Sequence, residues 1–233
     1  MNYIEHIVEP QRLLLTWQNE SDGNTRRIVA ELHREGNGAG LKYLTETPDF
    51  EKALNLQFKG YPGFSIEQAS YKDVLGFFIK RLPQKSREDF QQFLEACRIS
   101  GKDRDKVSDF ALLGYSGAKI PGDPFMVLNP FDNANDVPFE IFTKVEGTRY
   151  MNSSLSGLTE GMPVSIQPEP QNSFDPKAIQ IMVEGKTIGY INRVLLPCIH
   201  KNLSLGRIKE TFIEKINGSA ESPNYYVFIR ISL

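Results

Sequence analysis

The chain has 233 residues, of which 40% are hydrophobic and 24% charged, and its 27 Lys+Arg and 29 Asp+Glu residues leave a net charge of -2. This is the composition of a globular protein, and it excludes a disordered or collagen-like chain. The near balance of charge excludes bulk electrostatic wrapping of nucleic acid, although a local basic site is compatible with it.

The cysteines and the distribution of apolar residues indicate in which cellular compartment the protein is expected. Only two cysteines are present, Cys97 and Cys198, and their separation matches no metal or redox motif. We therefore expect no disulfide framework and a reducing environment. The segment 1–6 has neither the basic region nor the apolar run of a signal peptide, and no stretch approaches the roughly 18 apolar residues of a membrane span. These features predict a cytoplasmic protein.

Hydrophobic periodicity divides the first part of the chain into strands followed by helices. Apolar residues that recur with period two predict three strands, at 12–17, 27–32 and 54–58. The first two flank residues 21–24, which have the composition of a hairpin turn. Period 3.6 predicts three helices: 74–82, 86–97 and one that begins at Asp105 or Ser108 and ends at Gly114 or Gly117. Strands followed by helices indicate an α+β domain.

Residues 129–138 have the composition of a linker. They include two prolines, three asparagines and two aspartates, which oppose both a helix and a central strand. Charge also changes there: residues 1–137 hold 17 basic and 20 acidic residues, net -3, and residues 138–233 hold 10 and 9, net +1. We predict an α+β domain over 1–128, a linker over 129–138 and a second domain over 139–233.

The second domain is predicted to consist mostly of strands. A two-residue turn is predicted at 184–185 and a short helix at 193–200. Runs of alternating apolar and polar residues predict six short strands, at 139–143, 162–166, 179–183, 186–190, 210–216 and 225–231. So many short strands in fewer than 100 residues need a closed or nearly closed barrel to protect their edges. We therefore predict a small β-barrel.

Enzyme signatures are missing from the sequence. It has no phosphate-binding P-loop, zinc-protease, serine-hydrolase or kinase motif. The glycine-rich run 36–40 is not followed by a helical pattern, which favours a hairpin loop over a phosphate cradle. His6, His33 and His200 lie apart from one another and from the cysteines, which favours packed or surface imidazoles over metal ligands or catalytic bases. We expect a non-catalytic protein without a cofactor or a metal.

The richest group of polar and aromatic residues lies in the second domain. Arg149 and Tyr150 end a predicted strand, and Asn172, Phe174 and Asp175 lie in a loop that enters another strand. Tyrosine and phenylalanine rings can stack on unpaired bases, arginine can pair with phosphates, and asparagine can bond to base edges or sugars. A carboxylate beside a polyanion is repulsive unless it accepts a hydrogen bond, and the free end of a nucleic acid supplies a hydroxyl for this.

The run from a strand into the short helix adds Tyr190 and Arg193 to this group, Arg193 as a second phosphate-binding arginine. A purely structural interpretation is also open. Asn172 or Asp175 could bond to its own backbone in a turn, Phe174 could fill the core, and the tyrosines could cover one end of the barrel.

These elements closely resemble the HIRAN domain over about residues 138–233. The family pattern is an Arg-Tyr-like pair, a hydrophobic strand, E-P-x-N-x-[YF]-D-x-x-A-I, and a G-x-x-I-G-[YH] strand that leads into a basic helix. The corresponding runs here are 147–150, 163–166, 169–179 and 185–193. The resemblance implies an OB-like barrel, and one member of the family captures single-stranded 3′-OH DNA ends.

The resemblance also implies roles for individual residues. Tyr150 and Phe174 would hold the terminal bases, while Asn172 and Asp175 would meet the terminal sugar and its hydroxyl. The arginines would hold phosphates, Tyr190 would line the pocket, and an aromatic of the last strand, Tyr226 or its neighbour Tyr225, would complete it. The candidate DNA-binding residues are Arg149, Tyr150, Asn172, Phe174, Asp175, Tyr190, Arg193 and Tyr226. Phe174, Tyr190 and Arg193 depart from the commonest family residues but keep stacking or charge.

The first half resembles, more weakly, the N-terminal subdomain of HipA-type toxin kinases. Five runs follow the order of the family motifs over about residues 25–128: 41–44, 54–58, 76–84, 109–114 and 120–123. The polar identities within the motifs differ, and the kinase lobes are absent, so the resemblance implies a scaffold without phosphoryl transfer. In some relatives a free-standing version of this subdomain is an antitoxin to a separate kinase.

Together these observations predict a two-domain, non-catalytic DNA-binding protein. The second domain would recognise single-stranded DNA ends carrying a 3′-OH, in DNA repair, replication or defence, and the first domain would contact a protein partner such as a helicase, nuclease or HipA-type kinase. The alternative is an antitoxin-like regulator that binds a HipA-type kinase. An enzyme of unknown type is a third hypothesis.

Overall fold

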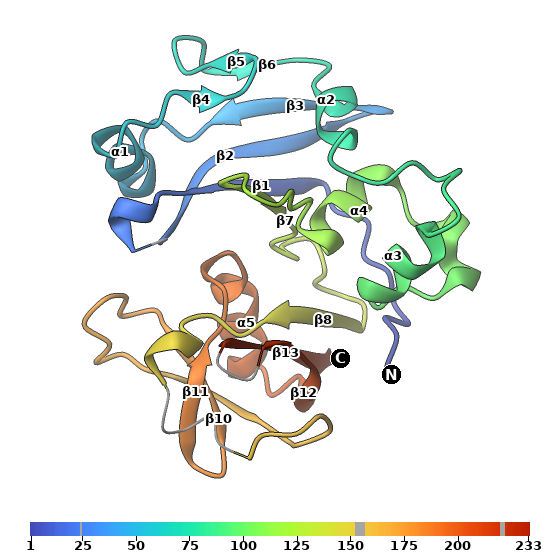
Figure 1. Cartoon of the computed structure of the whole chain (residues 1–233), viewed down its shortest axis with the longest axis vertical. Helices are drawn as coiled ribbons and strands as arrows, with labels where there is room; N and C mark the ends of the chain where they lie inside the picture. Colours follow the sequence, from blue (N-terminus) through green and yellow to red (C-terminus); the bar gives the residue numbers. More distant parts are fainter. Residues whose placement is uncertain (24, 152–156, 220–221) are drawn as a thin grey trace. The chain divides into compact units, whose positions relative to one another are not determined.

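The computed structural model describes residues 1–23, 25–151, 157–219 and 222–233, and it divides into two compact units. The N-terminal unit contains Glu9–Cys97 and Lys102–Asn133. The C-terminal unit contains Ala134–Leu233 together with Met1–Val8 and Arg98–Gly101. The protein has a mixed α/β fold with few helices and a β-rich C-terminal region, which confirms the predicted fold class (Figure 1).

The N-terminal unit is built on an antiparallel five-stranded sheet with the order β6-β3-β2-β1-β7. The glycine-rich run lies at the β2–β3 hairpin, where Glu35 pairs with Gly38, so the prediction of a hairpin loop is confirmed. The strands of this unit are β1 (Arg12–Gln18), β2 (Arg26–Glu35), β3 (Gly38–Tyr43), β4 (Gly60–Tyr61), β5 (Phe64–Ser65), β6 (Ser70–Tyr71) and β7 (Phe125–Leu128). Its helices are α1 (Pro48–Asn55), α2 (Leu75–Ile79), α3 (Phe90–Ala96) and α4 (Asp109–Ser116), with short 3₁₀ turns η1 (Glu20–Asp22) and η2 (Gly101–Lys106).

One predicted strand of this unit is wrong. Residues 54–58 end helix α1 and form the turn after it, because Thr47 caps the helix by accepting a hydrogen bond from the Phe50 amide and Pro48 occupies its first turn. The predicted β1–β2 pairing is confirmed, although Asn24 of the turn at 21–24 lies outside the described residues. The three predicted helices correspond to α2, α3 and α4, and Ser108 is the N-cap of α4.

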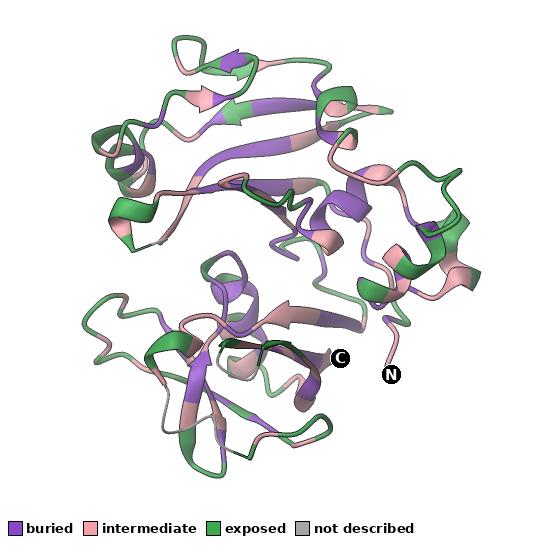
Figure 2. Ribbon diagram, viewed as in Figure 1, coloured by how far each residue is buried: buried purple, intermediate pink, exposed green. Residues whose placement is uncertain are grey.

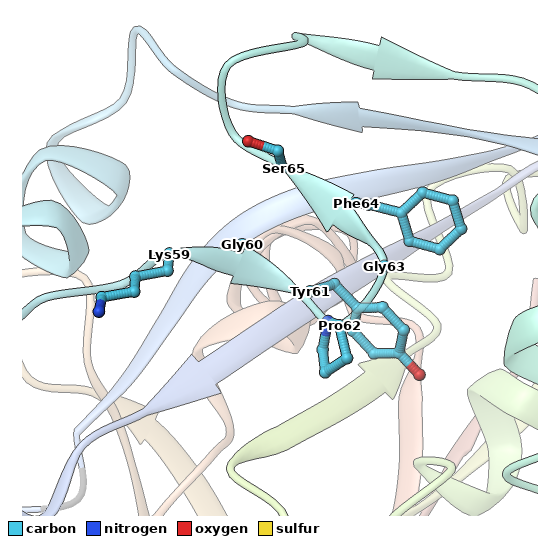
Figure 3. A pocket seen from close by; sticks show the side chains of 7 residues that line it. All are labelled: Lys59, Gly60, Tyr61, Pro62, Gly63, Phe64 and Ser65. Carbon is cyan, nitrogen blue, oxygen red and sulfur yellow. The ribbon is translucent and has the colours of Figure 1, made fainter.

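A buried tyrosine holds the β4–β5 hairpin onto the core of this unit. Tyr43 is 1% exposed; its hydroxyl donates to the Phe64 carbonyl at 2.6 Å and accepts from the Tyr61 amide at 2.8 Å. Burial raises the pKa of this hydroxyl, so it stays protonated and able to donate. Figure 3 shows the shallow pocket at this hairpin, lined by the continuous stretch 59–65.

Tyr43→Phe is therefore expected to destabilise the N-terminal unit by about 1–3 kcal/mol, because it leaves a buried amide and a buried carbonyl without their partner. Trp17, the single tryptophan of the chain, lies in the core of this unit, so chemical denaturation followed by tryptophan fluorescence reports on it. Tyr71→Phe is the matched control, since the Tyr71 hydroxyl donates to the Ser65 carbonyl at 2.7 Å in an exposed position of the same region. Equal midpoints for the two variants would contradict the role of Tyr43.

The C-terminal unit is a small barrel made of two three-stranded sheets, β11-β10-β9 and β12-β13-β8. A bridge between Glu146 and Tyr190 joins β8 to β11 on one side, and a bridge between Pro163 and Phe212 joins β9 to β12 on the other, so the strand order closes on itself. The elements are β8 (Phe139–Lys144), β9 (Ser165–Pro168), β10 (Ile179–Val183), β11 (Lys186–Tyr190), β12 (Ile208–Ser219), β13 (Ser222–Ile231), α5 (Leu196–Ser204), and the 3₁₀ turns η3 (Thr148–Tyr150) and η5 (Arg193–Leu195).

Local sequence explains much of this barrel. Glu184 and Gly185, both with positive φ, form the predicted two-residue turn between β10 and β11. Gly189 has φ 151°, and a Cβ there would lie 2.4 Å from the Glu146 carbonyl oxygen, so the closing bridge requires glycine. Two predicted strand positions are wrong: β9 begins at Ser165 rather than 162, and Arg149 and Tyr150 lie in η3 rather than at a strand end.

Part of the outer face of the β12-β13-β8 sheet, around Glu140 and Glu214, is covered by two segments that are distant in sequence. Arg98 and Glu214 form an ion pair at 2.9 Å, with side chains only 4% and 3% exposed. The amide and side chain of Asn2 donate to the two carboxylate oxygens of Glu214 at 3.0 and 2.8 Å. The sequence did not indicate this association of residues 1–8 and 98–101 with the barrel.

A second buried carboxylate fixes the same N-terminal segment. Glu140 accepts hydrogen bonds from the amides of Glu5 and His6 at 3.0 and 3.1 Å, and the His6 ring nitrogen Nδ1 lies 3.0 Å from its other oxygen. These three side chains bring potential metal ligands together, but the Glu140 carboxylate already has protein partners on both oxygens. The group therefore serves to anchor the segment.

Both cysteines are free and buried, as expected for a chain without a disulfide framework. Burial raises the pKa of Cys97 to about 12, which keeps it a thiol and suits it to packing rather than to nucleophilic chemistry. Within the described ranges no helix combines the length and the apolar character that crossing a bilayer requires.

Candidate nucleic-acid interface

The loop between β9 and β10 presents one aromatic ring to solvent. Phe174 is 96% exposed, and Figure 2 shows the loop as largely exposed. The side-chain oxygen of Asn172 accepts hydrogen bonds from the amides of Phe174 and Asp175, both at 3.0 Å, and its Nδ2 donates to Glu169 at 2.6 Å. Asn172 therefore fixes the backbone of the loop, while the Phe174 ring has no core to pack on. A large apolar side chain held in solvent in this way is a candidate contact surface.

The η3 turn presents a second exposed ring. Gly147, with φ 73°, starts the turn directly after the bridge at Glu146, and Tyr150 at its end is 70% exposed. The Arg149 guanidinium carbon lies 4.7 Å from the centre of the Tyr150 ring. A cation stacked on an exposed ring offers both a charge for a phosphate and a flat surface for a base.

Tyr190 connects the two loops. Its backbone forms the bridge with Glu146, which precedes η3, through hydrogen bonds of 2.9 and 2.8 Å. Partial burial and the nearby Glu169 carboxylate of the β9–β10 loop raise the pKa of Tyr190. The end of β11 is therefore the point from which both exposed aromatic residues are positioned.

Arg193 and Asp175 form an ion pair across the same site. Arg193 starts η5, which Asn192 caps by accepting a hydrogen bond from the Val194 amide. The Arg193 Nε lies 3.3 Å from Asp175 Oδ2, and the other oxygen of Asp175 accepts from the Lys177 amide at 2.9 Å. The pair is partly exposed, so the carboxylate is held in place while remaining accessible to a hydroxyl group, and the arginine offsets its charge.

Tyr226 lies on β13 and differs from the other candidates in its surroundings. It pairs with Lys144 of β8 and Lys215 of β12, and its ring stacks on Phe142 with centroids 5.3 Å apart and planes at 21°. Its neighbour Tyr225 is 4% exposed, so of the two aromatics considered for the last strand, Tyr226 is the accessible one.

The structure thus brings seven of the eight candidate residues to the two loops and the strand end around Tyr190. Part of the purely structural interpretation holds, because Asn172 and Asp175 do bond to the loop backbone. Its placement of Phe174 in the core is wrong. The predicted DNA contacts themselves stay predictions.

Two acidic residues of the site were missed by sequence reasoning. Glu169 accepts a hydrogen bond from Asn172 and, with burial, raises the pKa of Tyr190, and Glu146 accepts a hydrogen bond from Asn192 at 3.0 Å. Glu169 lies within the E-P-x-N motif, which was the available signal for it. Nothing in the sequence around Glu146 marks it as a partner of a residue 46 positions away.

Comparison with known proteins places a family match on the unit that carries this site. The model of the HIRAN domain family matches residues 138–233, so this segment is a HIRAN domain. The match indicates DNA binding as the activity of this region. No curated protein matches the chain.

Two solved structures are similar at low identity. The crystal structure of the HIRAN domain of human HLTF has 17% identity and a TM-score of 0.33, with 40% of this chain and 74% of that chain covered. The crystal structure of a protein from Lactobacillus plantarum has 20% identity and a TM-score of 0.31, with 42% of this chain and 99% of that chain covered. The predicted likeness of the first half to HipA-type kinases is not supported by these comparisons.

Proposed function

We propose that the HIRAN domain of this protein binds the end of a single DNA strand and that the protein acts without catalysis, in DNA repair, replication or defence. The observation that carries the proposal is the pair of exposed rings, Phe174 and Tyr150, on hydrogen-bonded turns around one strand end. Unpaired bases stack on such rings without regard to sequence.

Within this proposal each polar residue has a role. Arg149 and Arg193 bind phosphates next to the stacked bases. The Asp175 carboxylate, oriented by Arg193 and the Lys177 amide, accepts a hydrogen bond from the terminal 3′-hydroxyl, and Asn172 positions it. Tyr190 lines the site between the two loops.

The N-terminal unit is assigned a separate role as a protein-contact module. The residues of this unit, Glu9–Cys97 and Lys102–Asn133, include 16 Lys+Arg and 18 Asp+Glu, a net charge of -2, which disfavours a second DNA-binding surface there. Co-purification of a protein partner that is lost when this unit is altered would support the assignment.

The direct test of the proposal is fluorescence anisotropy with labelled DNA at fixed salt. We expect tightest binding to a single strand with a 3′-OH, weaker binding to the same strand with a 3′-phosphate, and weakest binding to a blunt duplex. Equal affinity for the two single strands would contradict recognition of the end, and absence of binding to all three would contradict DNA binding.

Asp175→Asn is expected to weaken binding to the 3′-OH strand about tenfold or more, because a hydrogen bond to a charged acceptor is replaced by one to a neutral acceptor. The substitution keeps an oxygen that can accept from the Lys177 amide, so the loop keeps its conformation. Binding to the 3′-phosphate strand is expected to change little and provides the internal control. An unchanged affinity for the 3′-OH strand would contradict the assigned role of Asp175.

A further inference from the structure

The outer face of the β12-β13-β8 sheet carries a row of one tyrosine between two lysines. Tyr226 on the central strand β13 is paired with Lys144 on β8 and with Lys215 on β12. Directly paired residues of antiparallel strands project from the same face, with neighbouring Cβ atoms about 4.5–5.5 Å apart. The three side chains therefore form one row across the sheet, which we call the Lys-Tyr-Lys row.

Burial shows that this row faces outward. The next residue along β13, Val227, is 0% exposed and is paired with the fully buried Ile213 of β12, so these residues point into the barrel. Tyr226 and Lys144 have the opposite orientation because side chains alternate along a strand. On β12 the register shifts between Ile213 and Lys215, and this irregularity makes Lys215 the partner of Tyr226 on the outward face. All three are partly exposed, and solvent can reach them.

The tyrosine of the row has an aromatic neighbour on the same face of the sheet. Its ring stacks on Phe142, and the Arg98 guanidinium carbon lies 4.9 Å from the centre of the Phe142 ring on the same face. Glu214, the acidic residue next to Lys215, is turned into the buried ion pair with Arg98. The row thus combines a braced aromatic ring with two cations, while the adjacent carboxylate is directed away from the surface.

The row begins next to the proposed DNA-end site. Lys144 is the last residue of β8, and the chain continues through Glu146, which is bridged to Tyr190, into the exposed pair Arg149 and Tyr150. Three neighbouring strands span about 10 Å, which is enough for about three phosphates at the roughly 3.4 Å spacing of a stacked strand.

From this arrangement we infer that the Lys-Tyr-Lys row binds the part of the single DNA strand that leaves the end site. Lys144 and Lys215 bind phosphates as point charges, and Tyr226 stacks on one base between them. The inference rests on the proposed function, and it adds an extended strand path to a site that would otherwise hold only the terminal nucleotides.

Strand length separates this inference from the proposed function. Anisotropy is measured for a trinucleotide and a dodecanucleotide with the same 3′-OH end, over a range of salt concentrations, with the wild type and with the double variant Lys144→Ala, Lys215→Ala. We expect the double variant to lose affinity for the dodecanucleotide and to show a smaller slope of log K against log salt, by about 0.7 for each lysine, with little change for the trinucleotide.

Two further double variants control for charge and folding. Lys186→Ala with Lys209→Ala removes two exposed lysines elsewhere in the same unit and is expected to leave the difference in salt slope between the two oligonucleotides as in the wild type. Lys144→Arg with Lys215→Arg keeps the charge and is expected to retain tight binding of the dodecanucleotide. An unchanged dodecanucleotide slope in the alanine variant, with 3′-OH-dependent trinucleotide binding intact, would overturn the inference alone. Failure of the wild type to bind either oligonucleotide would overturn the proposed function as well.

Discussion

Arg98→Ala is expected to lower the free energy of unfolding of the C-terminal unit by about 3–5 kcal/mol. Removing one partner of a buried ion pair leaves the other charge without compensation, and among the described residues the Glu214 carboxylate then keeps only its hydrogen bonds from Asn2. The single tryptophan lies in the N-terminal unit, so the transition of the barrel is followed by hydrogen exchange detected with mass spectrometry of peptides from 139–231.

The control for this prediction is Lys209→Ala, which removes a charge from an exposed position of the same unit and is expected to change stability by less than about 0.5 kcal/mol. Arg98→Met combined with Glu214→Leu is expected to recover part of the loss, because apolar side chains of similar size need no charge partner in a buried site. Wild-type protection of the barrel peptides in Arg98→Ala would contradict the importance of this pair.

Tyr150→Ala and Phe174→Ala are each expected to weaken binding of single-stranded DNA by about 1–3 kcal/mol, or about 5- to 150-fold in dissociation constant. The reason is the loss of a stacking surface for one base. Both side chains are mostly exposed, at 70% and 96%, so their removal should leave the stability of the unit nearly unchanged. Anisotropy with a 3′-OH strand measures the first effect, and thermal denaturation measures the second.

Leu205→Ala provides a matched comparison for the two aromatic substitutions. Leu205 is an exposed apolar residue of the same unit, 52% exposed, and lies at the end of α5. Removal of the Leu205 side chain is expected to leave the affinity for DNA unchanged. Phe174→Tyr is also expected to retain the affinity, because the tyrosine ring keeps the stacking face. Wild-type affinity in both Tyr150→Ala and Phe174→Ala would contradict the stacking role of the two loops.

Short-range sequence patterns correctly predicted the elements that depend on interactions between residues close in sequence. The β10–β11 hairpin was predicted with its bounds, since strict alternation and the Glu184-Gly185 turn act over a few residues. The strand predicted at 54–58 was wrong because three alternating apolar residues also fit the end of a helix, and the deciding signal was the cap at Thr47 and Pro48. Period-two patterns as short as this one do not distinguish the two structures.

The sequence predicted the residues of the candidate site but not the contacts that position them. The loop motif led directly to Asn172, Phe174 and Asp175, which lie within four positions of one another. The Arg193–Asp175 pair and the Glu146–Tyr190 bridge depend on the closure of the barrel, which brings together segments 18 and 44 residues apart. Such contacts follow from tertiary packing, and no local pattern contains them.

The attachment of residues 1–8 to the barrel has a consequence for the order in which the protein can fold during synthesis. Asn2 is made 212 positions before Glu214, the residue whose carboxylate it binds. Until then β8 lacks its paired strand β13, and the segment 1–8 lacks the carboxylate that Asn2 binds. The barrel can therefore be completed only after β13 has been made, while the sheet of the N-terminal unit, whose last strand β7 ends at Leu128, can form earlier.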